Sequence, residues 1–490
     1  MTTLDIRTQA WNNALSINAG TIDTRISSDQ IIGSVPASLK KGRILSNGPG
    51  WNRYDSGVIH PFDGHGYLRS FEFEEDGSVH CRARFIETAA YVQESQSQQF
   101  EIRGFATNPS KHFWKNIGFG TPRNVANTTI YRWNNQLLAG WEGGSPHAID
   151  AQTLDTIGVE TFDGLIEGQT TLAHMCQDPT QNRLIIANTK MGKDTALTFH
   201  ELDAQNQPII SNTGTLKGAA FVHDFTITPN WYIVGGNPLS IDYLKAVKAF
   251  LGSGTLLTSV SANTRQPGEI VLISRKSDGE QRRIQLPKPV FVVHFANAFE
   301  HPDGTVILDA CIFHDFPFGE EFGYAGRDKA FDPTRPEKRG PQSLYRITVP
   351  PDATQGTWRK LCTLGVDFPR VLREYTGQDA PYMVGATRAD PHFSDPFDSL
   401  FYLDLHTPEA EPQIWSTNDS TFVGEPIPIS GAHDEPDHVA AMLTDGHNQR
   451  NTLAIFEMPN IADGPVCQIP LPFMPLAFHG EWDGLGSRVL

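Results

Sequence analysis

Short stretches of apolar residues, alternating with polar ones or continuous, recur from one end of the chain to the other. They are rich in β-branched and aromatic residues, and Gly, Pro, Asn or Asp bounds most of them. This pattern predicts many short β-strands joined by turns. The clearest stretches are YLRSFEF (67–73), TTIYRWNNQLLAGWE (128–142), NRLIIANTK (182–190), TVILDACIF (305–313), SLFYLDL (399–405) and NTLAIFEM (451–458).

A chain of many short strands is typical of a β-sandwich, a barrel or a propeller. No repeat signature chooses among these three folds. No linker, low-complexity tract or change of composition divides the chain, although a prior of about 150 residues per domain would allow three domains. We therefore expect a single all-β domain over residues 1–490, whose first segment, 1–25, is irregular.

One segment, GNPLSIDYLKAVKAFLG, departs from the strand pattern. Asn237 would cap a helix, Pro238 suits its first turn and Gly252 suits its end. The apolar residues that share one face of this helix are Tyr243, Leu244, Val247, Phe250 and Leu251. On base rates this face packs over the β core, which is the interpretation we favour. The alternative is an apolar patch near 239–251 that touches a membrane holding an apolar substrate.

The charge balance narrows the choice of partners. Lys and Arg together number 39 against 56 Asp and Glu, which gives a net charge of −17. An acidic chain without a basic run argues against nucleic acid as a ligand. The sequence indicates no obligate protein partner.

The cysteines and the start of the chain bear on its location. Five cysteines, at positions 81, 176, 311, 362 and 467, form no CxxC pair. An odd, widely spaced set fits neither a disulfide framework nor a thiolate zinc site and is typical of reduced, intracellular thiols. The first residues lack the apolar region of a signal peptide, and no apolar run reaches the roughly 18 residues of a spanning helix. We expect a cytoplasmic protein, either fully soluble or peripherally bound to a membrane.

Histidine is the informative residue, because the signatures GxSxG, GxGxxG, HExxH and the Walker loop are absent from the sequence. Four of the 17 histidines stand in apolar contexts beside predicted strands: His174, His223, His294 and His479. A single histidine in such a place is more often a core residue with satisfied hydrogen bonds than a ligand. Four of them would meet only in a closed, radial fold, so their spacing leaves both interpretations open.

Eight ordered motifs, spread over nearly the whole chain, are those of a known family. They are SNGPG (46–50), HPFDGHGYL (60–68), NVANTTIYRWNNQLLAGWEGGSPH (124–147), FVHDFTITPNW (221–231), HFANAFE (294–300), DFPR (367–370), GEPIPI (424–429) and FHGEW (478–482). With these motifs the sequence resembles the carotenoid cleavage oxygenases, and among them the cyanobacterial apocarotenoid oxygenases most.

The resemblance implies a seven-bladed β-propeller that carries one Fe(II) on its axis, under a dome of loops and short helices. Carried over motif by motif, the ligands of the iron are His174, His223, His294 and His479. The family often has two adjacent histidines at the third position, and only the first, His294, is present here. The resemblance also implies three acidic residues that accept a hydrogen bond from the other ring nitrogen of three ligands: Glu142, Asp367 and Glu425.

Metal chemistry agrees with this ligand set. Imidazole suits Fe(II), and four neutral ligands leave two positions of an octahedron open. Carboxylates behind the ligands fix the orientation of each ring and raise its basicity. Four-coordinate zinc satisfies the same ligand list, but structural zinc sites usually include thiolate.

Two motifs depart from the family pattern. Asp367 stands where the family usually has Glu, whose side chain is about 1.5 Å longer. Either the backbone closes this gap or a water molecule bridges it. The sequence Asp63-Gly64-His65-Gly66 replaces the family's DGDG, and we interpret this change as variation in a surface turn.

The implied activity is cleavage of one conjugated C=C bond of a carotenoid or apocarotenoid by O₂, which gives two carbonyl products. By its motif position Thr128 would crowd the remaining open position of the iron; the alternative is an ordinary strand threonine. Because a polyene offers almost no hydrogen bonds, its binding depends on buried apolar area at about 25 cal/mol per Å². The candidates by motif position are Trp141, Phe113 and Phe221. Each is also a plausible core residue, Phe113 above all.

Trp141 bears on the choice of substrate. Stilbene-cleaving relatives tend to have Lys just before the glutamate of this motif, placed to engage a phenol oxygen, and the indole here favours an apolar polyene. The alternatives are a stilbene- or phenylpropanoid-cleaving dioxygenase, the isomerohydrolase branch of the same superfamily, a propeller hydrolase, and a non-catalytic propeller that binds ligands or partners.

Overall fold

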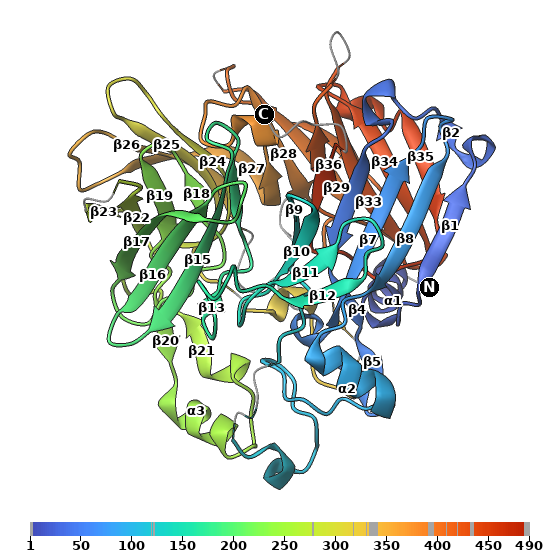
Figure 1. The fold of residues 1–490 in the computed structure, drawn as a ribbon, viewed down its shortest axis with the longest axis horizontal. Helices are drawn as coiled ribbons and strands as arrows, with labels where there is room; N and C mark the ends of the chain where they lie inside the picture. Colours follow the sequence, from blue (N-terminus) through green and yellow to red (C-terminus); the bar gives the residue numbers. More distant parts are fainter. Residues whose placement is uncertain are drawn as a thin grey trace.

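β-Strands dominate the computed structural model of the chain (Figure 1). The structure describes residues 3–118, 120, 123–276, 279–316, 318–329, 331–332, 342–390, 396–407, 409–418, 420–431 and 436–484. Three α-helices lie within this part of the chain: α1 (Thr3–Ser16), α2 (Ala89–Ser97) and α3 (Tyr243–Phe250). Of the predicted all-β fold, the coarser statement that the chain is mostly β is confirmed.

Strands from both ends of the chain share one sheet. Its order is β1-β8-β7-β3-β36, and β4 also pairs with β7. The strands are β1 (Ile22–Ile26), β3 (Arg43–Asn47), β4 (Pro49–Trp51), β7 (His65–Phe73), β8 (Val79–Phe85) and β36 (His479–Asp483). The antiparallel pairing of β3 with β36 sets Asn47 opposite His479. The last strand of the described chain is therefore fixed by its third.

Three antiparallel sheets follow along the chain. The first contains β9 (Thr129–Trp133), β10 (Gln136–Gly140), β11 (His147–Asp150) and β12 (Thr156–Val159). The second contains β13 (Thr170–Thr171), β14 (Cys176–Asp178), β15 (Arg183–Met191), β16 (Thr195–Leu202) and β17 (Pro208–Leu216). The third contains β18 (Thr226–Ile227), β19 (Trp231–Gly235), β22 (Glu269–Ser274) and β23 (Gln281–Gln285).

The next sheet runs through seven consecutive strands. They are β24 (Phe291–Glu300), β25 (Val306–Phe313), β26 (Ser343–Val349), β27 (Thr357–Arg370), β28 (Tyr382–Thr387), β29 (Ser399–Asp404) and β30 (Gln413–Ser416). The long strand β27 pairs with β26 as far as Gly365 and with β28 from Val366 onward. It thus connects two groups of four strands.

A last large sheet has the order β2-β35-β34-β33-β31, with β32 also paired to β33. Its strands are β2 (Ile32–Gly33), β31 (Thr421–Val423), β32 (Ile427–Ile429), β33 (His438–Asp445), β34 (Arg450–Glu457) and β35 (Cys467–Leu471). Two small ribbons complete the strands: β5 (Arg53–Tyr54) with β6 (Gly57–Val58), and β20 (Leu239–Ile241) with β21 (Val260–Ala262).

Apolar cores fill the spaces between neighbouring sheets. One core joins the sheet of β3 and β7 to that of β34 and β35, through residues that include Ile44, Phe71, Ile455 and Ile469. Another joins β22 to β24 and β25, through Leu272, Val292 and Leu308 among others. All eight residues of β25 are buried, since this strand has neighbours on both faces. Burial on both faces explains a continuous apolar run in place of strict alternation.

The prediction of an irregular segment over residues 1–25 is wrong. Residues Thr3–Ser16 form α1, and β1 begins at Ile22. The ring of Trp11 meets that of Phe422 edge-on, with 4.9 Å between the centroids. The buried face of the helix consists of Ala10, Trp11, Ala14 and Leu15. Their i, i+4 spacing was the signal available in the sequence.

The predicted helix near residues 237–252 exists, but it begins later and faces outward. Leu239–Ile241 form β20, and the Asp242 carboxylate caps α3 by accepting the N–H of Lys245 at 3.0 Å. Gly252 follows the helix with φ +82°, as expected for its end. Leu244 is 78% exposed. The favoured interpretation, a helix packed over the β core, is therefore wrong.

Helices α2 and α3 gather at one end of the molecule, together with the 3₁₀ helix η4 (Phe113–Asn116) (Figure 1). Among the described helices, not one combines the length and the apolar character that crossing a bilayer requires. All five cysteines are unpaired, as expected. The count of seven blades stays a prediction.

A candidate metal centre

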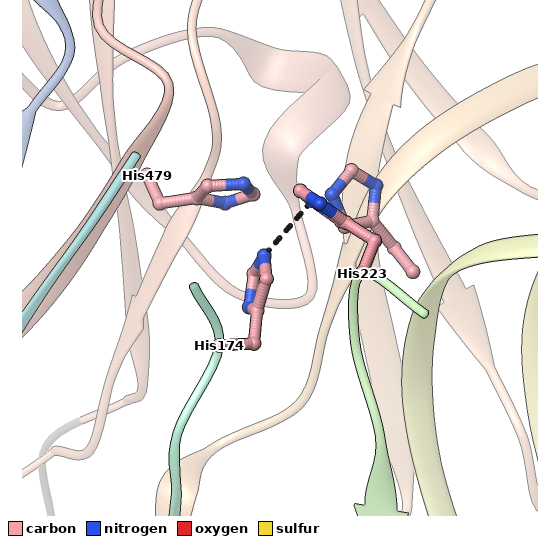
Figure 2. A group of neighbouring side chains, drawn as sticks. His174, His223 and His479 are labelled. Carbon is pink, nitrogen blue, oxygen red and sulfur yellow. Dashed lines mark hydrogen bonds between the residues drawn. The ribbon is translucent and has the colours of Figure 1, made fainter. Parts of the chain in front are cut away.

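Four histidines far apart in the sequence meet inside the molecule; Figure 2 labels three of them, His174, His223 and His479. His174 precedes β14, His223 precedes β18, His294 lies on β24 and His479 begins β36. One ring nitrogen of each lies within 4.8 Å of one ring nitrogen of every other. The sequence could not decide between scattered core histidines and a converging set, and the structure has the converging set.

Each of three histidines directs Nδ1 at a carboxylate. Nδ1 of His479 lies 3.0 Å from Oε1 of Glu425, and Nδ1 of His223 contacts Oε1 of Glu142. Nδ1 of His294 lies 2.6 Å from Oδ1 of Asp367. The structure thus joins each of the three predicted acidic residues to one histidine.

The backbone closes the gap that the shorter side chain of Asp367 leaves. The pairing of β27 with β28 shifts register between Asp367 and Arg370, and Phe368 within this bulge has φ +51°. A bulge redirects the side chain beside it, and Asp367 contacts His294 without a bridging water. This carboxylate outweighs the effect of burial and raises the pKa of His294. The ring of Phe368 packs 5.3 Å from the rings of both His294 and His479.

The remaining ring nitrogens face one another. Nε2 of His174 lies 3.2 Å from Nε2 of His223 (Figure 2). Nε2 of His294 is buried and has no hydrogen-bond partner within the described residues. A neutral imidazole that donates from Nδ1 presents a lone pair at Nε2. Lone pairs converging on one point repel one another unless a cation lies among them, so the four histidines fit a metal ion.

Burial and neighbouring charges together set the protonation states of this cluster. Burial, followed by the neighbouring histidines, lowers the pKa of His174 well below its usual value. Burial also lowers the pKa of His479. Burial opposes ionisation of Glu425, but Arg370 and His479 outweigh it and bring the pKa to about 2. Neutral imidazoles beside ionised carboxylates are the forms that metal binding requires.

A cavity of about 170 Å³ adjoins His174, His294 and His479. Arg370 pairs with Glu425 there at 3.0 Å, and Arg373 pairs with Glu481 at 2.9 Å. The sequence did not single out these two arginines or Glu481. Their signal was their place inside the motifs DFPR and FHGEW, or just beyond them.

The aromatic candidates lie in three different settings. Phe221 is nearly parallel to His223, with 6.2 Å between the ring centroids, and it also contacts the rings of Phe291 and Phe318. Trp141 is half-buried and directly precedes Glu142. Phe113 lies on η4 and is 53% exposed, so the expectation of a core position is wrong.

Thr128 is buried and held from two directions. Its N–H donates to the carbonyl of Gly140, and its hydroxyl donates to Oδ1 of Asn127 at 3.2 Å. The amide of Asn127 in turn donates to the carbonyls of Phe62 and Gly64. The side chain of Thr128 is thereby fixed in orientation, and its role at the metal stays a prediction.

The interpretation of Asp63-Gly64-His65-Gly66 as a surface turn is wrong. His65 is fully buried, and its Nε2 lies 2.9 Å from Oε2 of Glu94 on α2. Arg123 also pairs with Glu94, at 2.6 Å. Oδ1 of Asp63 accepts the N–H of Phe105 at 2.7 Å. The polar residues of this motif tie α2 and its following loop to the first sheet.

Comparisons with known proteins place the chain in one group of enzymes. A family model described as "RPE65: Retinal pigment epithelial membrane protein" matches residues 19–483. The apocarotenoid-15,15'-oxygenase of Synechocystis sp. is 30% identical over 467 residues, which cover 93% of this chain and 92% of that protein. The chloroplastic carotenoid cleavage dioxygenase 7 of Oryza sativa subsp. japonica is 27% identical, covering 92% and 87%. The solved structure of cobalt-substituted Synechocystis ACO matches with a TM-score of 0.88 at 28% identity, covering 97% of this chain and 98% of that one.

Proposed function

The chain belongs to the family of the carotenoid cleavage oxygenases and the retinal pigment epithelial membrane protein, and from this premise we propose that it uses Fe(II) and O₂ to cleave one conjugated C=C bond of an apocarotenoid or carotenoid into two carbonyl products. The observation that carries the proposal is the convergence of four imidazoles, three of them buried, with Nε2 of His174 facing Nε2 of His223 and Nε2 of His294 buried without a hydrogen-bond partner in the described part of the chain. Neutral nitrogen ligands suit Fe(II).

The residues that would hold the iron are His174, His223, His294 and His479. Glu142, Asp367 and Glu425 would keep three of these rings in the tautomer that offers Nε2, and their charges would offset that of the ion. When bound, Fe(II) would supply the one-electron chemistry that O₂ needs in order to react with an alkene. Thr128, fixed by Asn127, would restrict the space beside the ion.

The chain would bind the polyene by apolar contact. An alkene lying against Phe221 would be close to the four histidines, because that ring stacks beside His223. Phe291 and Phe318 make the wall behind Phe221 apolar. Trp141 places an indole, not a cation, next to Glu142, which favours a polyene over a stilbene or phenylpropanoid. Phe113 would meet the substrate at the surface, before it reaches the centre.

We also propose the seven-bladed propeller that the resemblance implies. When the seven-stranded sheet is divided at β27, the large sheets become seven groups of four or more strands. Each group, or the loop that adjoins it, contributes one residue to the centre. In chain order these residues are Glu142, His174, His223, His294, Asp367, Glu425 and His479. Helices α2, α3 and η4 would form the dome at one end of the axis.

A surface that we call the apolar platform supports peripheral attachment of a cytoplasmic enzyme to a membrane. The platform consists of exposed apolar residues of α3 and η4 and their flanks: Phe113, Trp114, Ile117, Tyr243, Leu244, Val247, Phe250 and Leu251. Lys115 and Lys248 lie within these two segments, and residues 102–141 and 243–268 contain no Asp or Glu although the chain carries −17 overall. Exposed apolar side chains with lysines around them are typical of helices that lie on an anionic bilayer.

The platform is built as one unit. Arg103 donates to the carbonyls of Asn116 and Gly118 on the η4 side, and to those of Ala249 and Gly254 on the α3 side. The N–H of Gly118 donates to the carbonyl of Phe250 at 2.8 Å. Two segments far apart in the sequence therefore present their apolar residues together.

The test is turnover of a defined panel by the Fe(II)-loaded protein. Apocarotenals of several lengths, an intact carotenoid and resveratrol are incubated under ¹⁸O₂, and the products are identified by mass. We expect labelled carbonyl products from apocarotenals and none from a His294→Ala variant. Turnover of resveratrol alone would make this a stilbene-cleaving enzyme. No turnover of any compound would favour a non-catalytic propeller, and activity in the variant would refute the site.

A further inference from the structure

His174 differs from the other three histidines in what lies behind it. Its Nδ1 faces the hydroxyl of Tyr131 at 3.4 Å. The carboxylate recorded beside it, Oδ1 of Asp224, is farther away at 3.7 Å. In the other three histidines Nδ1 contacts a carboxylate oxygen at 3.0 Å or less. One of the four rings is therefore held by a neutral oxygen.

Asp224 is not free to move toward His174. Its Oδ1 accepts the N–H of Phe225 at 2.7 Å, and its Oδ2 accepts the N–H of Phe295 at 2.8 Å. The second bond fixes Asp224 to β24, the strand that carries His294. Both oxygens of the carboxylate are thus bound to backbone N–H groups, which hold Asp224 at 3.7 Å from Nδ1 of His174.

Tyr131 is held in position by its own packing. It lies on β9, in the sheet beside that of His174, and packs against an apolar cluster that includes Trp133, Leu138 and Met175. Its phenolic hydroxyl has lone pairs that can accept the N–H of an imidazole.

We propose that Tyr131 is the positioning residue for His174: its hydroxyl oxygen accepts the Nδ1–H of that ring and so directs Nε2 toward the other three histidines. The proposal rests on the proposed function, because it assumes that the four histidines bind a metal. A neutral acceptor polarises an imidazole less than a carboxylate does. His174 is accordingly the weakest donor of the four, and the centre is asymmetric.

The test compares Co(II) binding in the wild type and in Tyr131→Phe, with Co(II) as the probe because its absorption bands report the ligand set. We expect the variant to bind Co(II) roughly 10-fold more weakly, the lower end of what loss of a partner behind a ligand costs, and to show shifted bands. A matched control is Tyr232→Phe, which removes a buried hydroxyl that bonds Glu201 at 2.8 Å. This control should leave both readouts unchanged.

Wild-type affinity and an unchanged spectrum in Tyr131→Phe would overturn the proposal. Should Tyr131→Phe fail to fold, Tyr131→Leu takes its place, because leucine also lacks the hydroxyl oxygen but differs from phenylalanine in shape. His174→Ala and His294→Ala separate this proposal from the one it rests on. Wild-type Co(II) binding in both alanine variants would refute the metal site itself, whereas loss of Co(II) in them with no effect at Tyr131 would refute only the role of Tyr131.

Discussion

At the four-histidine centre, charged and polar side chains are buried, whereas on the apolar platform large hydrophobic side chains are exposed. Glu425 is 7% exposed and His294 also 7%, while Tyr243 and Leu244 are 76% and 78% exposed. In most proteins charged and polar side chains are exposed and large hydrophobic side chains are buried, which is the reverse of what these two regions show. Burial of charged groups costs stability and exposed apolar side chains add little to it, so each arrangement points to a demand other than folding.

The two regions are also held together differently. The centre is assembled from side chains far apart in the sequence, and Nδ1 of three of its histidines contacts a carboxylate oxygen. The platform is joined by backbone carbonyls that all converge on Arg103. Chemistry at the centre needs fixed side chains, while attachment to a lipid surface needs only a fixed backbone and apolar area. The predictions below test whether the centre depends on its side chains and the platform on its apolar area.

The largest effect should follow from removing a ligand at the centre. In His294→Ala we expect loss of bound iron and a fall in activity of more than about 100-fold, since loss of a ligand exceeds the cost of losing a partner behind one. Metal content by mass spectrometry and turnover of an apocarotenal check this. His301→Ala, just beyond the same strand and exposed, is the control and should keep both. Iron retained at wild-type stoichiometry in His294→Ala would contradict the site.

A buried histidine away from the centre separates burial from metal binding. Nδ1 of His60 accepts the N–H of Phe62 at 3.1 Å, and its Nε2 lies 3.0 Å from the carbonyl of Gly319. Both nitrogens are thus satisfied in the neutral ring, and burial lowers the pKa to about 4. Since the unfolded value is about 6.5, the stability from this group is complete above that pH and is lost as the pH falls toward 4, up to about 3 kcal/mol.

Urea unfolding at several pH values between 7 and 4 measures this loss. His60→Gln keeps a donor and an acceptor without a titrating ring, so its free energy of unfolding should fall less over this range than that of the wild type. His447→Gln, an exposed position in the turn after β33, should follow the wild type. Added metal should not change the difference between wild type and His60→Gln. Parallel curves for these two proteins would show that His60 does not sense this pH range.

A more modest effect should follow from neutralising a carboxylate behind a ligand. Asp367→Asn keeps the size of the side chain but replaces the anion that accepts from His294, and we expect metal affinity to fall about 10- to 100-fold. Asp303→Asn, in the exposed turn after β24, is the matched control and should bind metal as the wild type does. Unchanged metal affinity in Asp367→Asn would mean that the carboxylate of Asp367 does not orient the ring of His294.

The sequence motifs located the residues of the centre well because each motif combines a chemical group with its strand. The four histidines meet in the structure, and each of the three acids contacts one of them. The contact of Asp367 was beyond prediction, because it depends on the backbone of Phe368 at φ +51°, a state that sequence does not encode locally. Tyr131 was also missed, since its partner is 43 residues away.

The fold class followed from the strand pattern, but the surroundings of single segments did not. An apolar helical face looks the same in sequence whether it meets a core or a membrane, which is why α3 was placed wrongly. His65 seemed to be a turn residue because Glu94, its partner, comes from a helix that packs from outside the motif. Local patterns thus predict elements and chemistry, whereas tertiary contacts decide which face is covered.

The smallest predicted effect concerns the platform. Replacing Leu244 with Asp removes one apolar side chain and adds a charge, and since burial of a leucine stabilises by about 1.5–3 kcal/mol, partition onto anionic vesicles should fall roughly 10-fold. The residue is already exposed, so the free energy of unfolding should not change. Activity on a vesicle-dissolved apocarotenal should show a raised KM with kcat unchanged, and activity on the same substrate in detergent should equal that of the wild type.

The control is Ile157→Asp, at an apolar and exposed position on the edge strand β12. If Leu244→Asp co-sediments with vesicles as the wild type does, or if Ile157→Asp loses binding equally, the platform is not what meets the lipid, and the exposed face of α3 serves another surface.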